Sequence, residues 1–151
     1  MTVTDLEAEA AGLILAQFDE RLALRLGLIV VDIARAAALP IIINIRTANR
    51  TLFHAALPGS AANNDAWARR KSNTALMFAE ASMITGTRHR DTGVSLAKHG
   101  LPAADYADHG GAVPITVKGV GMVAVATVSG LPQREDHALM VRGIQTLIAQ
   151  L

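Results

Sequence analysis

The residues with the clearest chemical potential lie in one segment, Asn63–Asn73 (NNDAWARRKSN). Arg70 and Lys71 follow Trp67 by three and four residues, so on a helix both cations project from the same face as the indole. Free backbone N–H groups at a helix start, together with two cations, favour binding of a carboxylate or another anion. We therefore predict an anion site here, with Asn64 at the helix start. A structural role stays open, in which the cations lie over the indole or pair with acids of a neighbouring subunit.

The five histidines offer a second kind of chemistry. His89, His99 and His109 are spaced by ten residues, whereas metal ligands on one element are usually three or four residues apart. We therefore expect surface or hydrogen-bonded histidines and no metal site. His54, in an expected strand, faces either a cavity or solvent. His54 and His109 remain candidate ligand-binding residues, and His137 is expected to form a local hydrogen bond at the start of the last helix.

No complete catalytic set is visible in the sequence. The chain has no Cys, which excludes disulfides, thiolate metal sites and a Cys nucleophile. The glycines at 110–111 and 119–121 are not followed by an expected helix, so they do not match a phosphate loop, and a Gly-x-Ser-x-Gly motif is absent. We therefore rank binding or interaction above catalysis and name no catalytic residue.

The composition limits the class of protein. With 151 residues, 51% of them hydrophobic and 3% aromatic, the chain fits a single domain (1–151) whose core consists of Ala, Val, Ile and Leu. A net charge of +1 gives no basis for attraction to nucleic acid or anionic membranes. The low charged content of 18% predicts surface covered by other subunits of a homo-oligomer. The apolar runs are too short for a membrane span and the N-terminus is acidic, so we expect a cytoplasmic protein.

The stretch Gly110–Gly130 is the element around which the others must pack. It predicts a β-hairpin with a strand over Ile115–Lys118, a turn over Gly119–Gly121 and a longer strand over Met122–Ser129. The longer strand is apolar on both faces, and such strands lie inside a sheet. We therefore expect it in the middle of the sheet.

The remaining segments complete an α+β domain. A capping-box spacing at Thr4 and Glu7 predicts a first helix that ends near Leu24. Three β-branched or alternating runs with short links predict consecutive antiparallel strands, at Leu28–Ala34, Ile41–Arg46 and Thr51–Leu57. Further helices are expected at Asn63–Met83, around Val94–Lys98 as a short turn, and after Pro132, with a buried stripe of Met140, Ile144, Leu147 and Leu151. The predicted order is α-β-β-β-α-β-β-α, with a five-stranded, mostly antiparallel sheet flanked by helices.

Two motifs resemble those of the haem-degrading-domain family, which includes GlcG-like and HbpS-like proteins. One is G-G-x-x-P-I-x-x-x-G-x-G at Gly110–Gly121, with V-S-G at 128–130 and an Asp that opens a helix at Asp136. The other, N-N-x-x-W-x-x-R-K at Asn63–Lys71, resembles a largely uncharacterised cytoplasmic branch of that family with bacterial and fungal members. The resemblance implies a profilin-like fold, symmetric homo-oligomers, and haem binding or breakdown as in some relatives.

Three hypotheses follow from these residues. The first is an oligomeric protein that binds haem or another small anionic ligand through Asn64, Trp67, His54 or His109, with ligand carboxylates such as haem propionates meeting Arg70 and Lys71. The second is a non-catalytic scaffold or adaptor that binds another protein. The third is an enzyme acting on a small carboxylated metabolite, with Lys71 or a His as acid or base.

Overall fold

The computed structural model describes residues 1–151. They form an α+β fold with one sheet. The helices are α1 (Val3–Ala11), α2 (Glu20–Ala36), α3 (Ala62–Phe78), α4 (Ser82–Thr92) and α5 (Gln133–Ala149), with a 3-10 helix, η1, at Leu96–His99. The strands are β1 (Ile14–Leu15), β2 (Ile42–Arg46), β3 (Thr51–Ala56), β4 (Ala112–Val117) and β5 (Gly121–Ser129).

The five-stranded sheet has the order β1-β4-β5-β2-β3. Strand β1 pairs with β4 in parallel, and the other three pairs are antiparallel. The central strand is β5, and its residues 124–129 are buried. The predicted hairpin, its central position and the mostly antiparallel sheet are therefore confirmed. Gly119 and Gly121 flank the turn with φ angles of 77° and 104°, which are left-handed values that favour glycine.

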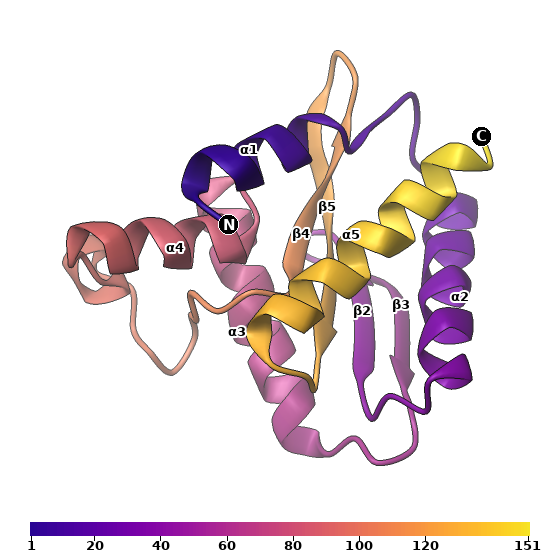
Figure 1. Cartoon of the computed structure of the whole chain (residues 1–151), viewed down its shortest axis with the longest axis horizontal. Coiled ribbons are helices and arrows are strands. Elements are labelled where there is room, and N and C mark those ends of the chain that lie inside the picture. The colour runs from indigo at the N-terminus through magenta and orange to yellow at the C-terminus, as the bar shows by residue number, and fades with distance from the viewer.

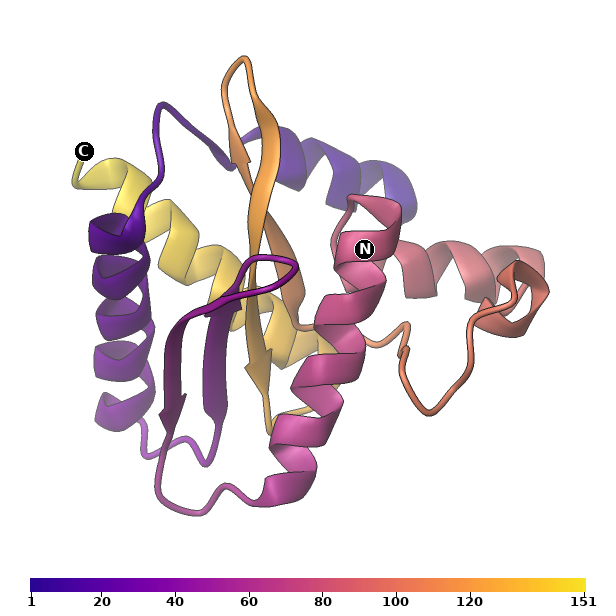
Figure 2. The ribbon, with the colours of Figure 1, turned by 180° about the vertical axis from the view of Figure 1, so that it is seen from behind.

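The helices form layers on both faces of the sheet. Helices α2 and α5 cover one face (Figure 1), and α3 covers the other (Figure 2). The main core lies between the sheet and the α2–α5 layer, and α1 packs against α4 at one end of the molecule. A Cβ on Gly27 would lie 2.4 Å from the ring of Phe53, and one on Gly143 would lie 2.5 Å from Val30. Glycine therefore lets α2 approach both β3 and α5 closely.

The N-terminal part of the chain differs from the sequence prediction. Leu28–Ala34 is not a strand but the second half of α2, because Leu22, Leu26, Val30 and Ala34 recur at helical spacing and are buried. The β-branched composition of this run hid that periodicity. The first predicted helix is in fact two helices, and strand β1 between them supplies the fifth strand. The first helix is capped by Thr2 and Asp5 rather than Thr4 and Glu7.

The chain after α2 agrees more closely with the prediction. Strands β2 and β3 and helix α5 lie where they were expected, and η1 overlaps the predicted turn. The helix predicted to reach Met83 ends at Phe78, because Ala79 has a left-handed φ of 54°, and α4 then starts at Ser82. Leu151 is 57% exposed, so it does not belong to the buried stripe of α5. None of the helices combines the length and apolar character that crossing a bilayer requires.

Candidate functional site

Helix α3 separates two polar hollows. Asn64, Trp67 and Lys71 lie three and four residues apart, and all three line a cleft toward the start of α5. We call this the polar cleft. It encloses about 230 Å³, and His109 and Gln133 lie on its opposite side. The structure therefore brings four of the six predicted site residues together: Asn64, Trp67, Lys71 and His109.

A buried ion pair forms the floor of the polar cleft. The Lys71 Nζ donates hydrogen bonds to the Gly110 carbonyl (3.0 Å), the Val128 carbonyl (2.9 Å) and Asp136 Oδ2 (2.9 Å). An ammonium has three N–H donors, so none is left for a ligand. Asp136 Oδ1 accepts a hydrogen bond from the Leu131 amide at 2.9 Å. The pair thus ties α3 to the segment that leads into β4, to β5 and to α5.

Burial sets the electrostatics of this pair. Lys71 and Asp136 are each only 2% exposed. Loss of water lowers the pKa of the Lys71 ammonium and raises the pKa of the Asp136 carboxyl, while the opposite charge of each partner acts against these shifts. Gly111 leaves room for the ammonium, because a Cβ there would lie 2.4 Å from the Lys71 Nζ. The contact explains the need for glycine at position 111 of the hairpin motif.

The rim of the cleft is aromatic and cationic. The rings of Trp67 and His109 meet edge to face with 5.0 Å between centroids. The Arg70 guanidinium lies 4.4 Å from the centroid of the Trp67 ring, a cation–π arrangement, and its Nε donates to the Ala103 carbonyl at 2.9 Å. Arg70 thus lies over the indole, whereas Lys71 turns inward to an acid of its own chain.

Neutral groups around the rim offer hydrogen-bond donors. Asn64 Oδ1 accepts from the Ala61 amide at 2.8 Å, and Gln133 Oε1 accepts from the Gly110 amide at 2.9 Å. Because both side-chain oxygens bond to backbone, the two NH₂ groups remain for a ligand. The indole N–H of Trp67 is a donor only. The cleft therefore presents mainly N–H groups.

Charged groups of both signs lie near His109. Burial lowers the pKa of its imidazole most, and Arg90, Lys71 and Arg70 lower it further, while Asp108 alone raises it. Arg70 and Arg90 are not paired with a carboxylate and place positive charge near this side of the cleft, whereas Asp136 neutralises Lys71. The N–H donors and the unpaired cations both favour an anionic ligand.

His54 lies on the other side of α3, in the second hollow. Its Nε2 contacts Asp65 Oδ1 at 2.9 Å, and its Nδ1 accepts a hydrogen bond from Asn44 at 3.1 Å. The hollow encloses about 320 Å³ and is also lined by Arg46 and Arg69. Burial, and then the charge of Arg69, lowers the pKa of Arg46. The structure thus separates His54 from Trp67 and His109.

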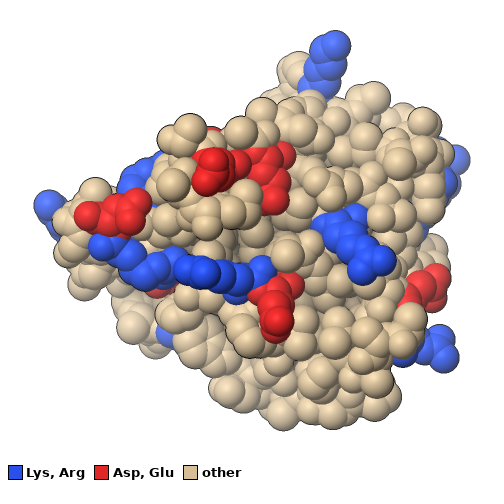
Figure 3. Space-filling model, viewed as in Figure 1, with Lys and Arg blue, Asp and Glu red and all other residues tan.

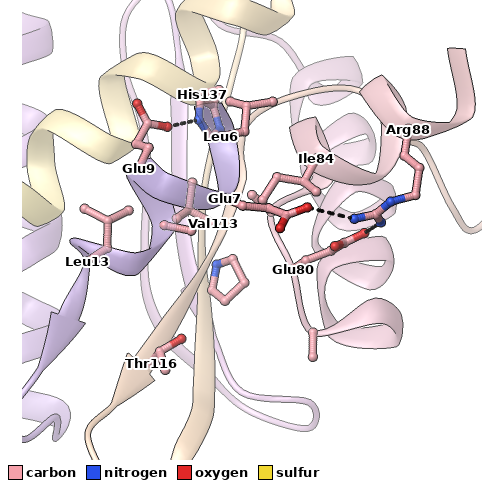
Figure 4. Close-up of a pocket in the computed structure, with 14 residues that line it drawn as sticks. Leu6, Glu7, Glu9, Leu13, Glu80, Ile84, Arg88, Val113, Thr116 and His137 are labelled. Carbon is pink, nitrogen blue, oxygen red and sulfur yellow. Dashed lines mark hydrogen bonds and ion pairs between the residues drawn. The ribbon is translucent and has the colours of Figure 1, made fainter. Parts of the chain in front are cut away.

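The sequence did not predict the contacts made by two other groups of side chains. His89 contacts Asp108 at 2.8 Å and stacks on His99 with 5.8 Å between centroids, so the ten-residue spacing does bring two histidines together. The His137 Nε2 contacts Glu9 at 2.7 Å, across 128 residues, rather than forming the local bond expected. His137 and Glu9 line an acidic pocket beneath α1 (Figure 4). Nothing in the local sequence signals either arrangement, because the partners come from distant elements.

Comparison with known proteins connects this geometry to a family. Residues 18–145 match the family model described as haem degrading protein HbpS-like. A UPF0303 protein of Streptomyces coelicolor is 43% identical over 150 residues, covering 99% of this chain and 95% of the relative. The crystal structure of the Ybr137w protein superposes with a TM-score of 0.90 at 30% identity, covering 98% of this chain and 88% of that one. A PduOC:haem complex has the same fold, with a TM-score of 0.70 at 18% identity over 89% of this chain and 94% of that one. The resemblance inferred from the hairpin motif is therefore confirmed, and the chain belongs to the HbpS-like haem-degrading family.

Proposed function

We propose that the protein binds a small carboxylate or a similar small anion in the polar cleft and acts as a ligand-binding protein rather than an enzyme. The observation that carries the proposal is the convergence of side chains with unbonded N–H donors beside Trp67 and His109, with the unpaired cations Arg70 and Arg90 nearby. An anion supplies the acceptors that these donors lack, and such charge-assisted hydrogen bonds are the strong ones.

The size of the cleft selects the size of the ligand. Pockets for drug-sized molecules span about 300–1,000 Å³, and the polar cleft encloses about 230 Å³. A carboxylate of a few carbon atoms fits this volume. A porphyrin with its two propionates does not, although Arg70 and His109 have the right chemistry for a propionate and an axial ligand. Haem binding by this chain therefore has support from the family but not from the cleft.

The arrangement gives little support to catalysis. Lys71 was a candidate acid or base, yet its three donors are bonded within the chain and it is buried. No base lies within hydrogen-bond reach of a nucleophile in the cleft, so the constellation that acyl or group transfer needs is incomplete.

Exposed Leu24 and Leu28 on the outer face of α2 support the further proposal that the binding protein is a homo-oligomer.

The only tryptophan of the chain makes the proposal testable. Trp67 lies in the cleft, so its fluorescence should respond when acetate, succinate or inorganic phosphate is titrated into the protein. An Asn64→Asp substitution keeps a side-chain oxygen that accepts from the Ala61 amide and adds a negative charge to the cleft. We expect it to weaken binding by about tenfold or more.

A control variant introduces the same change of charge outside the cleft. Gln145→Glu lies on the exposed side of α5, outside the cleft, and should leave the titration unchanged. The proposal fails if none of the three anions changes the fluorescence, or if Asn64→Asp and Gln145→Glu behave alike. A haemin titration with a Soret shift that Asn64→Asp does not affect would assign haem to another surface.

A further inference from the structure

The acidic pocket is separate from the polar cleft. It lies between α1, the link from α3 to α4, and β4 (Figure 4), and it encloses about 310 Å³. Its apolar walls include Leu6 and Leu13 on one side, Ile84 on another, and Val113 and Pro114 of β4. This volume is at the lower end of the range found for small-molecule pockets, about 300–1,000 Å³. The pocket therefore has room for a compact apolar group.

Carboxylates outnumber permanent cations at its rim. Glu7 contacts Arg88 at 3.5 Å, and Glu80 contacts the same guanidinium, so one cation serves two acids (Figure 4). Each of these carboxylates uses a single oxygen in the contact, so its second oxygen is open. Glu9 contacts only His137. The rim therefore presents acceptors and carries an excess of negative charge.

Helix α1 is responsible for much of this charge. It contains Asp5, Glu7 and Glu9 and no basic residue. Figure 3 shows acidic side chains gathered over α1 on the face of the molecule that also carries α5. Such a surface attracts cationic ligands and repels anionic ones.

The same helix also lies outside the part of the chain that defines the family. The family model covers residues 18–145, whereas α1 is Val3–Ala11. The Streptomyces coelicolor relative matches 99% of this chain. A pocket walled by α1 therefore does not follow from the match to the family model alone.

We propose that the acidic pocket is a binding site for a small apolar molecule that carries one primary amine. Its ammonium group lies between the open oxygens of Glu7 and Glu80, and its apolar body lies against Leu6, Leu13 and Val113. An ammonium has three donors and no acceptor, which complements a rim of carboxylates. A carboxylate ligand meets repulsion there, and a neutral apolar ligand leaves the acceptors without donors.

A pair of matched ligands tests the chemistry. 2-Phenylethylamine and 2-phenylethanol have nearly the same shape, but only the first carries a positive charge at neutral pH. Titration followed by the backbone amide shifts of Leu6 and Thr116 should give at least about tenfold tighter binding for the amine. Glu7→Gln should weaken the amine by about threefold to tenfold and leave the alcohol unchanged.

Two further substitutions separate ligand binding from a structural role. Arg88→Met removes the cation that competes for Glu7 and Glu80, so amine binding should become tighter, whereas a purely structural ion pair predicts weaker binding. Ala10→Phe on α1 fills the pocket and should abolish binding of both ligands. Ala8→Phe, on the exposed side of the same helix, is the control and should change nothing.

The proposal is overturned if the alcohol binds as tightly as the amine, because the charged rim then plays no part. It is also overturned if Ala10→Phe leaves amine binding intact. It is overturned as well if the native protein does not bind the amine, and a change in the sedimentation mass of Ala10→Phe but not of Ala8→Phe would then assign the pocket to a contact between subunits. None of these results depends on whether the polar cleft binds anions.

Discussion

The polar cleft and the acidic pocket use charge in opposite ways. In the cleft, Lys71 and Asp136 neutralise each other at 2% exposure, and the neutral side chains of Trp67, Asn64 and Gln133 line the ligand space. In the acidic pocket, Glu7 and Glu80 share one partly exposed arginine and keep open oxygens. The comparison teaches that the charged groups most prominent in a sequence need not be those that recognise a ligand. Unbonded N–H donors favour a negatively charged ligand, and unbonded carboxylate oxygens favour a positively charged one.

The largest expected effect comes from breaking the floor of the cleft. Lys71→Met leaves the Asp136 carboxylate buried without its cation and should lower the free energy of unfolding by about 3–5 kcal/mol at neutral pH. Urea unfolding followed by Trp67 fluorescence measures this. Arg70→Ala, one residue earlier and at the rim, should cost less than about 1 kcal/mol. Equal losses for the two variants would contradict the division between a structural lysine and a rim arginine.

The stability lost in Lys71→Met depends on pH, and the Asp136 carboxyl sets the direction of that dependence. Burial already raises the pKa of Asp136, and removal of Lys71 removes the charge that opposes this shift. The folded variant then holds a proton that the unfolded chain, with an Asp pKa of about 3.9, releases. Stability is therefore retained at acidic pH and lost as pH rises through the folded-state pKa. Lys71→Met should approach the native protein in stability toward about pH 4 and differ most at pH 7, and a double variant with Asp136→Leu should remove this dependence.

A smaller effect should appear in ligand affinity at His109. Asp108, Arg90, Lys71 and Arg70 act on this imidazole, and burial together with the three cations keeps its pKa below the ordinary value of 6.5. His109 is thus neutral at pH 7, and protonation adds a positive charge beside the bound anion. Affinity for formate should increase about threefold to tenfold as the pH falls from above the ordinary imidazole value to below the lowered pKa of His109.

His109→Gln provides the comparison for that titration. Glutamine keeps an N–H donor at the rim but does not titrate, so affinity should become nearly independent of pH. The acidic pocket should show no such increase for 2-phenylethylamine, because added positive charge does not favour a cation. A pH profile that persists in His109→Gln would assign the titrating group elsewhere.

The sequence predicted the elements with strong local signals. The hairpin was found from its glycines and its doubly apolar strand, and α5 from its apolar stripe together with Glu135 and Asp136 in its first turn. Leu28–Ala34 was assigned wrongly because β-branched residues suit strands, while burial against Gly143 and the sheet favours a helix there. Tertiary packing outweighed local propensity in that segment.

The candidate site was predictable only within one helix. The spacing of Asn64, Trp67 and Lys71 placed them on one face of α3, but the inward turn of Lys71 depends on Asp136, 65 residues later. The acidic pocket depends similarly on Glu7 of α1 meeting Arg88 of α4. Contacts between distant segments carry no local periodic signal. That is why the anion site was partly anticipated and the acidic pocket was not.

The smallest expected effect concerns His54, which the sequence grouped with the site and the structure places across α3. Its contact with Asp65 joins side chains that are 40% and 42% exposed, so water screens the pair and His54→Ala should change stability by less than about 1 kcal/mol. The anion titration followed by Trp67 fluorescence should stay within about twofold of the native protein, because His54 does not line the polar cleft. The amine titration of the acidic pocket should not change either. A marked loss of anion affinity in His54→Ala would mean that the ligand extends around the start of α3 into the hollow of Arg46 and Arg69. The two hollows would then act as one larger site, and the small-ligand limit drawn from the volume of the cleft would no longer hold.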